Sequence, residues 1–517
     1  MTNFGFRFFE FTADQGFFLN GEHVELKGVC LHHDLGPLGA AVNKSSLKHR
    51  LKLLKDMGCN AIRTAHNPPA PELLELTDEM GFLVIDEIFD EWEKPKVENG
   101  YNHLWNQWAE KDLTAFIHRD RNHPSVIMWS LGNEIRDLAT DGGAENCKFL
   151  NDIAKKEDPT RPTTIGFNHE IPALKYNYVE MIDVPGWNYE PKNYNSFRKD
   201  YPNLKMYGSE TSSTVSSRGI YFLPAERRTV KNLTEEPFHV SGYSLDVVPW
   251  GQLPDYEFKA QDQNPGIAGE FVWTGVDYLG EPTPFNTAWP ARSSYFGIID
   301  LCGIPKDRYY LYQSKWTDKE VLHLIPHWNW EAGQRVDVHC YTNYQKAQLF
   351  LNGRSLGVRK KDTTELLTSY RLIWKNIMFE PGELKVVTLD TNNQPVKEMV
   401  RKTAGKAAKI KMKADRSVIA ADGKELCFIT VSVIDEKGTL CPNADHLINF
   451  SIVGNGTIKA VGNGDPTSLE SFVEPYRKVF NGKCMVIVQS TTVPGTIEIG
   501  AKSVGLESAF VNLNTEF

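Results

Sequence analysis

The sequence between about residues 24 and 312 alternates short apolar runs with longer amphipathic segments, and this rhythm limits the possible folds most strongly. Apolar residues three and four positions apart are typical of helices, whereas short apolar runs bounded by turn residues are typical of strands. Helices are expected at residues 45–57 and 71–80. Eight strands are expected, at residues 23–29, 59–64, 81–87, 126–134, 163–167, 179–184, 204–209 and 268–273.

Eight strands with helices between them predict a (β/α)8 barrel, the TIM-barrel fold, which we place at residues 26–315. The competing arrangement is a doubly wound open sheet, whose main support is a Gly-x-Gly-x-x-Gly motif after the first strand. No such motif follows the first expected strand. The barrel is therefore the preferred prediction.

The sequence after Trp316 contains strand-like segments with few helical patterns between them. Turn signals such as Asn352-Gly353 separate these segments, which is typical of β-sandwiches. Two immunoglobulin-like sandwiches are expected, at residues 316–404 and 405–517. Residues 1–25 are expected to be a lead-in β segment, with a hairpin turn at Asn20-Gly21. The whole chain is thus predicted to be a multidomain protein of an α/β part and all-β parts.

Two of the expected barrel strands end in glutamate. Trp129-Ser130-Leu131-Gly132-Asn133-Glu134 closes the fourth strand, and Lys205-Met206-Tyr207-Gly208-Ser209-Glu210 closes the seventh. In a barrel the carboxyl ends of the strands meet at one rim, where ligands bind. Either glutamate alone is more often a solvated or helix-capping residue. Two of them on one rim supply the proton donor and the nucleophile or base that glycoside hydrolysis requires.

The composition excludes several other classes of protein. The net charge is −9 and no basic stripe is interleaved with aromatic residues, so no nucleic-acid partner is expected. The eight cysteines are scattered without a metal-ligand spacing, so neither a disulfide scaffold nor a structural metal is expected. No apolar run approaches about 18 residues, and no membrane partner is expected. A soluble protein of the cytoplasm or periplasm is expected, with the compartment left open.

The two glutamate segments and three others resemble motifs of glycoside hydrolase family 2. The acid/base signature of that family is similar to the segment ending in Asn133-Glu134, preceded by Arg121-Asn122-His123-Pro124-Ser125. The remaining similar segments follow the order of the family and are Arg63-Thr64-Ala65-His66-Asn67-Pro68-Pro69, Val84-Ile85-Asp86-Glu87, Gly208-Ser209-Glu210 and Gly269-Glu270-Phe271-Val272-Trp273-Thr274-Gly275.

The resemblance implies a retaining exo-β-glycosidase without a cofactor, in which Glu134 is the acid/base and Glu210 the nucleophile. It also implies a carbohydrate substrate and substrate-binding roles for five residues, which are His66, Asp90, Asn133, Tyr189 and Trp273. Tyr189 is expected to donate a hydrogen bond to the nucleophile. A homo-oligomer remains possible.

Within the family the segments resemble those of β-galactosidases, which implies terminal non-reducing β-D-galactosides as substrates. The Asn-Lys pair of β-glucuronidases is not apparent after the eighth strand, yet β-glucuronidase and β-mannosidase remain open. A carbohydrate-binding protein of weak activity stays open too, as does a metal-dependent hydrolase using His32, His33 and Asp34. Relatives carry a sugar-binding jelly roll and a sandwich before the barrel. The expectation is that this chain begins at the tail of that sandwich.

Overall fold

The computed structural model describes residues 6–140 and 142–517, and the chain divides into two compact units built from interleaved segments. The first unit holds the residues up to His33, Gly58–Ser213 and Trp250–Gly275. The second holds Asp34–Met57, Thr214–Pro249 and Val276–Phe517.

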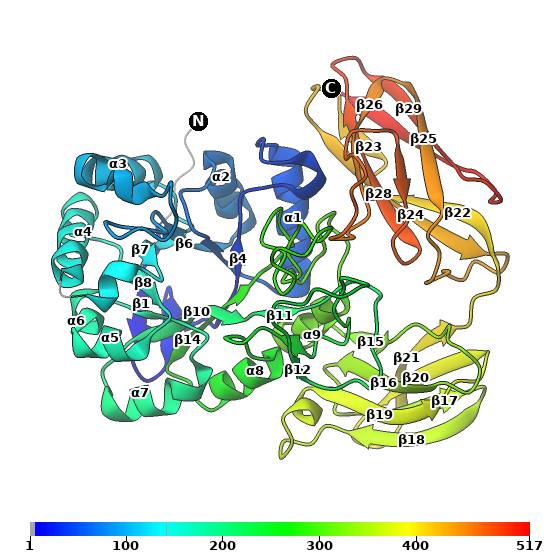
Figure 1. Ribbon diagram of the computed structural model, residues 1–517, viewed down its shortest axis with the longest axis horizontal. Helices are drawn as coiled ribbons and strands as arrows, with labels where there is room; N and C mark the ends of the chain where they lie inside the picture. The colour runs from blue at the N-terminus through cyan, green and yellow to red at the C-terminus, as the bar shows by residue number, and fades with distance from the viewer. Residues whose placement is uncertain (1–5, 141) are drawn as a thin grey trace. The chain divides into compact units, whose positions relative to one another are not determined.

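The first unit contains a closed barrel of parallel strands in the order β10-β14-β4-β5-β6-β7-β8-β9 (Figure 1). The strands are β4 (Leu26–Leu31), β5 (Ala61–Thr64), β6 (Leu83–Glu87), β7 (Val126–Asn133), β8 (Thr163–Phe167), β9 (Gly186–Asn188), β10 (Met206–Ser212) and β14 (Ile267–Trp273). Every neighbouring pair is parallel, so the eight carboxyl ends share one rim. The predicted barrel is confirmed.

Helices of the first unit lie around the outside of these strands (Figure 1). They are α2 (Pro71–Met80), α3 (Trp105–Asp120), α4 (Gly143–Glu157), α5 (Glu170–Lys175), α6 (Tyr178–Met181), α7 (Tyr194–Asp200) and α8 (Pro254–Asp262), with the 3-10 turns η2 (Tyr101–His103), η3 (Arg136–Ala139) and η4 (Pro191–Asn193). Their apolar faces pack on the strands, as where Phe116 of α3 meets Trp129 of β7 edge to face. This layer of apolar contacts fixes the strand ends that carry the polar residues described below.

One of the eight strand predictions, that for residues 179–184, is wrong. Residues 179–184 form most of helix α6 and the turn after it, and the barrel strand β9 comes later, at Gly186–Asn188. Val179 and Ile182 are both buried and lie three positions apart, which is helical spacing. Strand β9 has only three residues, too few for a period-two pattern to reveal it.

The lead-in segment forms the small antiparallel sheet β1 (Phe9–Thr12), β2 (Gly16–Leu19) and β3 (Glu22–His23). The turn between β2 and β3 is at Asn20-Gly21, where both residues have positive φ, so the predicted hairpin is confirmed. The first five residues of this segment lie outside the described residues.

The second unit contains helices α1 (Lys44–Met57) and α9 (Asp307–Trp316) and a small sheet of β11 (Thr214–Val215), β13 (Asp246–Val247) and β12 (Arg228–Thr229). It also contains a pair of sheets over residues 322–402. These are β15-β16-β19 (Leu322–Ile325, Arg335–Thr342, Arg371–Met378) and β18-β17-β20-β21 (Arg354–Lys360, Lys346–Leu351, Glu383–Leu389, Pro395–Lys402). Apolar side chains from both sheets share one core around Trp374, which is the arrangement of a sandwich. The short turns η1 (Gly36–Leu38) and η5 (Leu367–Ser369) also belong to this unit.

A second pair of sheets covers residues 407–516. One sheet is β22-β24-β28-β26 (Ala407–Ala414, Leu426–Asp435, Lys483–Ser490, Gly456–Gly462). The other is β23-β30-β29-β25-β27 (Val418–Ala420, Ala509–Glu516, Gly495–Lys502, Leu447–Gly454, Tyr476–Lys478). Their facing apolar residues again form one core. All-β sheets therefore follow the barrel in the chain, as predicted.

All eight cysteines are buried and unpaired. Within the described part of the chain, no helix is both long enough and apolar enough to cross a membrane.

Candidate active site

The carboxyl ends of the barrel strands gather a dense group of polar side chains in the first unit. Glu87, Asn133 and Asn188 are the last residues of β6, β7 and β9, and Glu134 and Tyr189 follow two of them directly. Because parallel strands end at the same rim, residues distant in the sequence meet here.

Arg63, in β5, lies at the centre of this group, donates hydrogen bonds to several of its members and is inaccessible to solvent. Its Nη1 donates to Glu210 Oε1 at 2.9 Å, and its Nη2 donates to Asn133 Oδ1 at 2.9 Å and to Glu87 Oε2 at 2.6 Å. Its Nε also donates to Glu87 Oε2, at 2.9 Å. Burial opposes ionisation of Glu87, but Arg63 and hydrogen bonds from His66 and Ser130 hold its pKa at about 2. One buried cation thus supports two carboxylates.

Glu210 is nearly completely buried, and both of its carboxylate oxygens are held by donors. Arg63 donates to Oε1, and the Tyr189 hydroxyl donates to Oε2 at 2.6 Å. Burial and the charge of Glu210 raise the pKa of Tyr189 far above its ordinary value, so the phenol keeps its proton and remains a donor. Donors of this kind stabilise a carboxylate in its ionised form.

Glu134 has a different environment. Its backbone is in the left-handed region, with φ of 47°, and its amide donates to Gly166 O at 2.8 Å. Its Oε1 accepts a hydrogen bond of 3.0 Å from Asn188 Nδ2. Burial, followed by the charge of Glu210, raises the pKa of Glu134 above its ordinary value. Glu134 is therefore suited to hold a proton, whereas the oxygens of Glu210 accept hydrogen bonds from Arg63 and Tyr189.

His66 and Trp273 form one wall of this group. Their rings stack with centroids 5.2 Å apart and planes 5° apart. His66 Nδ1 lies 2.6 Å from Glu87 Oε1, and Asn133 Nδ2 lies 3.3 Å from His66 Nε2. Burial lowers the pKa of His66 and Glu87 raises it, with an upward net direction. His66 Nε2 also lies 3.5 Å from Glu210 Oε1, and the charge of that carboxylate acts in the same upward direction.

The sequence matches a known family over this region. The profile of the glycosyl hydrolases family 2 TIM barrel domain matches residues 11–288, more than half of the chain. The chain belongs to glycoside hydrolase family 2. The profile of the family 2 C-terminal domain 5 matches residues 410–512, and that of a domain of unknown function matches residues 333–397.

Several known proteins are similar to most or all of this chain. The β-galactosidase BoGH2A of Bacteroides ovatus is 44% identical over 100% of this chain and 64% of its own length. A β-glucuronidase of Bacteroides fragilis is 27% identical over 77% of this chain and 56% of its own length. The crystal structure of a β-glycosidase from Bacteroides vulgatus is 34% identical, with a TM-score of 0.87 over 99% of this chain and 66% of that one. The chain thus spans less than two thirds of the length of the relatives it matches.

Four of the five expected substrate-binding residues lie within the family 2 site just described, namely His66, Asn133, Tyr189 and Trp273. The expected hydrogen bond from Tyr189 to Glu210 is present. Asp90 lies further out, in the loop after β6, where its carboxylate is exposed and pairs with Lys96 Nζ at 2.8 Å. The same Nζ donates to the Asn133 carbonyl oxygen at 2.8 Å.

Arg63, Glu87 and Asn188 were not among the expected site residues, although Arg63 and Glu87 lie in segments that resemble family motifs and Asn188 ends a barrel strand. Asn188 donates to both Asn133 Oδ1 and Glu134 Oε1, each at 3.0 Å. A rule that every polar residue at a barrel strand's carboxyl end is a candidate finds Glu87 and Asn188. No local pattern in the sequence points to Arg63.

The metal-ligand set considered at His32, His33 and Asp34 does not converge. His32 instead packs its ring edge-on against Trp273, with centroids 5.3 Å apart, and burial together with His66 lowers its pKa to about 3. Among the residues that the structure describes, no group of three or more His, Cys, Asp or Glu side chains has the geometry of a metal site.

Proposed function

We propose that this chain acts as a retaining exo-β-glycosidase that hydrolyses terminal β-D-galactosides. The observation that carries the proposal is the contrast between its two site glutamates. Burial and a neighbouring charge favour the protonated form of Glu134, whereas Arg63 and Tyr189 donate to Glu210. A retaining mechanism needs one carboxyl of each kind.

In the first step the Glu210 carboxylate attacks the anomeric carbon as the bond to the leaving-group oxygen breaks, and Glu134 donates its proton to that oxygen. The product is a glycosyl ester of Glu210. In the second step Glu134, now a carboxylate, takes a proton from water, whose oxygen attacks the anomeric carbon and releases Glu210. This mechanism requires the two carboxyl groups to lie about 5–5.5 Å apart.

Support for galactose comes from the β-galactosidase of Bacteroides ovatus at 44% identity. A β-glucuronide is the second candidate, because a relative in Bacteroides fragilis is a β-glucuronidase and Lys96 places a cation beside the Asn133 carbonyl. Asp90 already pairs with Lys96, however, and its negative charge disfavours a uronate carboxylate nearby. A neutral sugar is therefore preferred.

The test is a panel of aryl β-glycosides of galactose, glucose, mannose, fucose and glucuronic acid, assayed with the wild type and three variants. Galactoside should be hydrolysed fastest, and Glu134→Gln and Glu210→Gln should each lower kcat/KM on that galactoside by at least about 100-fold. Glu145→Gln, an exposed glutamate of α4, is the matched control and should leave it unchanged. Faster turnover of the glucuronide supports the second candidate, and turnover of none supports a carbohydrate-binding protein.

A further inference from the structure

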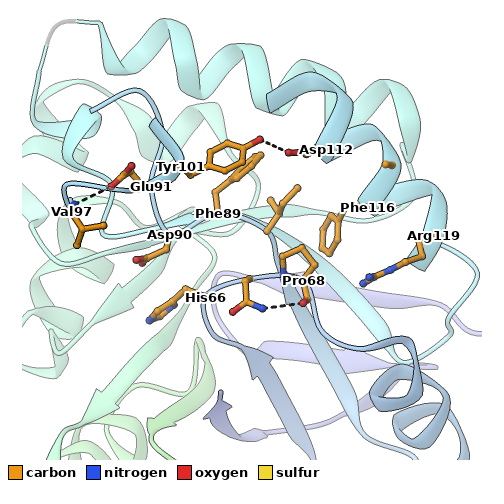
Figure 2. Close-up of a pocket in the computed structure, with 14 residues that line it drawn as sticks. His66, Pro68, Phe89, Asp90, Glu91, Val97, Tyr101, Asp112, Phe116 and Arg119 are labelled. Atoms are coloured by element: carbon orange, nitrogen blue, oxygen red, sulfur yellow. Dashed lines mark hydrogen bonds between the residues drawn. The ribbon is translucent and has the colours of Figure 1, made fainter. Parts of the chain in front are cut away.

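A pocket of about 490 Å³ opens beside the site, within the first unit. The segments after β5 and β6 and helix α3 line it (Figure 2). Its apolar lining consists of Pro68, Ile88, Phe89, Val97, Ala115 and Phe116. Small-molecule sites in proteins have volumes of about 300–1,000 Å³ and mostly apolar walls with a few polar groups. The pocket thus has the size and chemistry of a site for a ring-containing molecule.

One end of the pocket is shared with the catalytic group. His66 and Asp90 lie together there, away from Arg119 at the other end (Figure 2). His66 is the residue that bonds Glu87 and stacks on Trp273. The pocket therefore adjoins the catalytic group directly.

The acid/base segment forms the neighbouring edge. The amide of Asn133 donates to the carbonyl of the pocket residue Phe89 at 3.1 Å, and Lys96 joins Asp90 to the carbonyl of Asn133. Glu134 is the next residue along the chain. The pocket consequently borders the segment that carries Glu134.

The outer wall of the pocket is held in a fixed conformation. The buried carboxylate of Glu91 accepts hydrogen bonds from three backbone amides of the loop, those of Lys96, Val97 and Asn102. A Cβ at position 100 would overlap this carboxylate, so a larger residue there would have to displace it from these amides. A wall held by these hydrogen bonds has its conformation before a ligand binds, which lowers the entropic cost of binding.

We propose that this pocket binds the leaving group of the substrate, and that it selects β-glycosides whose aglycone carries a flat apolar ring next to the glycosidic oxygen. The inference rests on the proposed function. Glu134 protonates the leaving-group oxygen, so the leaving group extends toward the side of the site on which Glu134 lies. Beside the segment that carries Glu134 the described residues offer apolar walls, which favour a ring over a second sugar.

The same pocket holds an acceptor in the second step. An alcohol with an aromatic ring, bound there in place of water, loses its hydroxyl proton to Glu134 while its oxygen attacks the anomeric carbon and the ester bond to Glu210 breaks. The products are a new β-glycoside and the free Glu210 carboxylate. Transfer to 2-phenylethanol should therefore exceed transfer to methanol at equal concentration.

The experiment compares kcat/KM for two substrates of the sugar that the panel selects, the 2-naphthyl glycoside and the glycosyl fluoride, whose leaving group is too small to use the pocket. Val97→Arg and Ala115→Trp fill the pocket from exposed positions on its two walls, so neither substitution disturbs a core. Val504→Arg, on an exposed turn of the second unit, is the matched control. Because each substrate is compared with itself between variants, differences in leaving-group reactivity cancel.

Each pocket variant should lower the ratio of naphthyl to fluoride kcat/KM by about ten-fold or more, and the control should leave it unchanged. An unchanged ratio in both pocket variants overturns the inference. If the wild type does not hydrolyse the glycosyl fluoride at all, the proposed function is overturned instead. The ratio between variants tests only the role of the pocket. A binding measurement needs no turnover: the wild type should bind the 2-naphthyl thioglycoside more tightly than the methyl thioglycoside, and equal affinities overturn the inference as well.

Discussion

At the scale of single residues, the proposed division of labour depends on which neighbours surround two chemically identical side chains. Glu210 receives hydrogen bonds from a guanidinium and a phenol. Glu134 receives one from an amide, and burial raises its pKa. Hydrogen bonds to the charged form favour ionisation, and desolvation favours protonation, so the two environments separate the roles.

The pH dependence of kcat/KM follows from this difference. Glu134 acts in its protonated form, so activity should fall along a basic limb as pH rises through its raised pKa. The positive charge of Lys96 favours the ionised form of Glu134. Lys96→Met removes that charge, so the basic limb should move to higher pH.

The control for this experiment is Lys148→Met, which removes an exposed lysine of α4 whose ion-pair partner is Asp152. Its profile should match the wild type. A shift of the Lys96→Met basic limb to lower pH contradicts the assignment of Glu134 as the acid. Since the two carboxyls interact, the limbs report the pair rather than one residue alone.

The two glutamates could be predicted from the sequence, but Arg63, which donates hydrogen bonds to side chains from three other strands, could not. Glu134 and Glu210 lie in segments that are recognisable without a structure. Arg63 is recognisable as important only once Glu87 and Asn133, from two other strands, are seen to surround its guanidinium. Such convergence depends on strand order and register, which no local pattern in the sequence contains.

At the scale of elements, the loop between β6 and α3 connects the catalytic rim to the neighbouring pocket. The Glu91 carboxylate organises this loop by accepting hydrogen bonds from its amides. Gly100→Ala forces a Cβ against that carboxylate. We expect a loss of about 1–3 kcal/mol in the free energy of unfolding, because buried acceptors and amides lose their partners.

Chemical denaturation measures this loss, and Gly142→Ala supplies the comparison, since a Cβ at that position meets no atom within 4 Å. The comparison variant should stay within about 0.5 kcal/mol of the wild type. Equal stability of the two variants contradicts the role given to Glu91.

The elements themselves were predictable in proportion to their length. Helix α2 begins and ends where its proline and its periodicity indicate. Strand β9 was missed because three residues carry no alternation. Residues 179–184 were mistaken for a strand because Val179, Ile182 and Val184 are β-branched and common in strands.

At the scale of the whole molecule, the last sandwich has a core of its own. The buried cluster between its two sheets draws only on residues between Ala404 and Leu513, and its nine strands pair only with one another. A separate, smaller cluster joins its first sheet to Cys302 and Ile304. We therefore expect a fragment of residues 405–517 to fold independently, with a cooperative thermal transition and dispersed amide resonances. A fragment ending at residue 505 lacks β30, which lies between β23 and β29, and should not fold. An unfolded longer fragment contradicts the autonomy of this sandwich.

The central claim is that Glu210 is the nucleophile and Glu134 the acid/base, and the configuration of the azide product tests it most directly. Glu210→Gly and Glu134→Ala are each assayed on an activated aryl galactoside with added sodium azide. In Glu210→Gly, azide occupies the space left by the carboxylate and attacks the substrate from that side, so the galactosyl azide should have inverted configuration. In Glu134→Ala, Glu210 still forms the glycosyl-enzyme, which azide then attacks, so the product should have retained configuration. A retained product from Glu210→Gly together with an inverted product from Glu134→Ala would contradict the assignment.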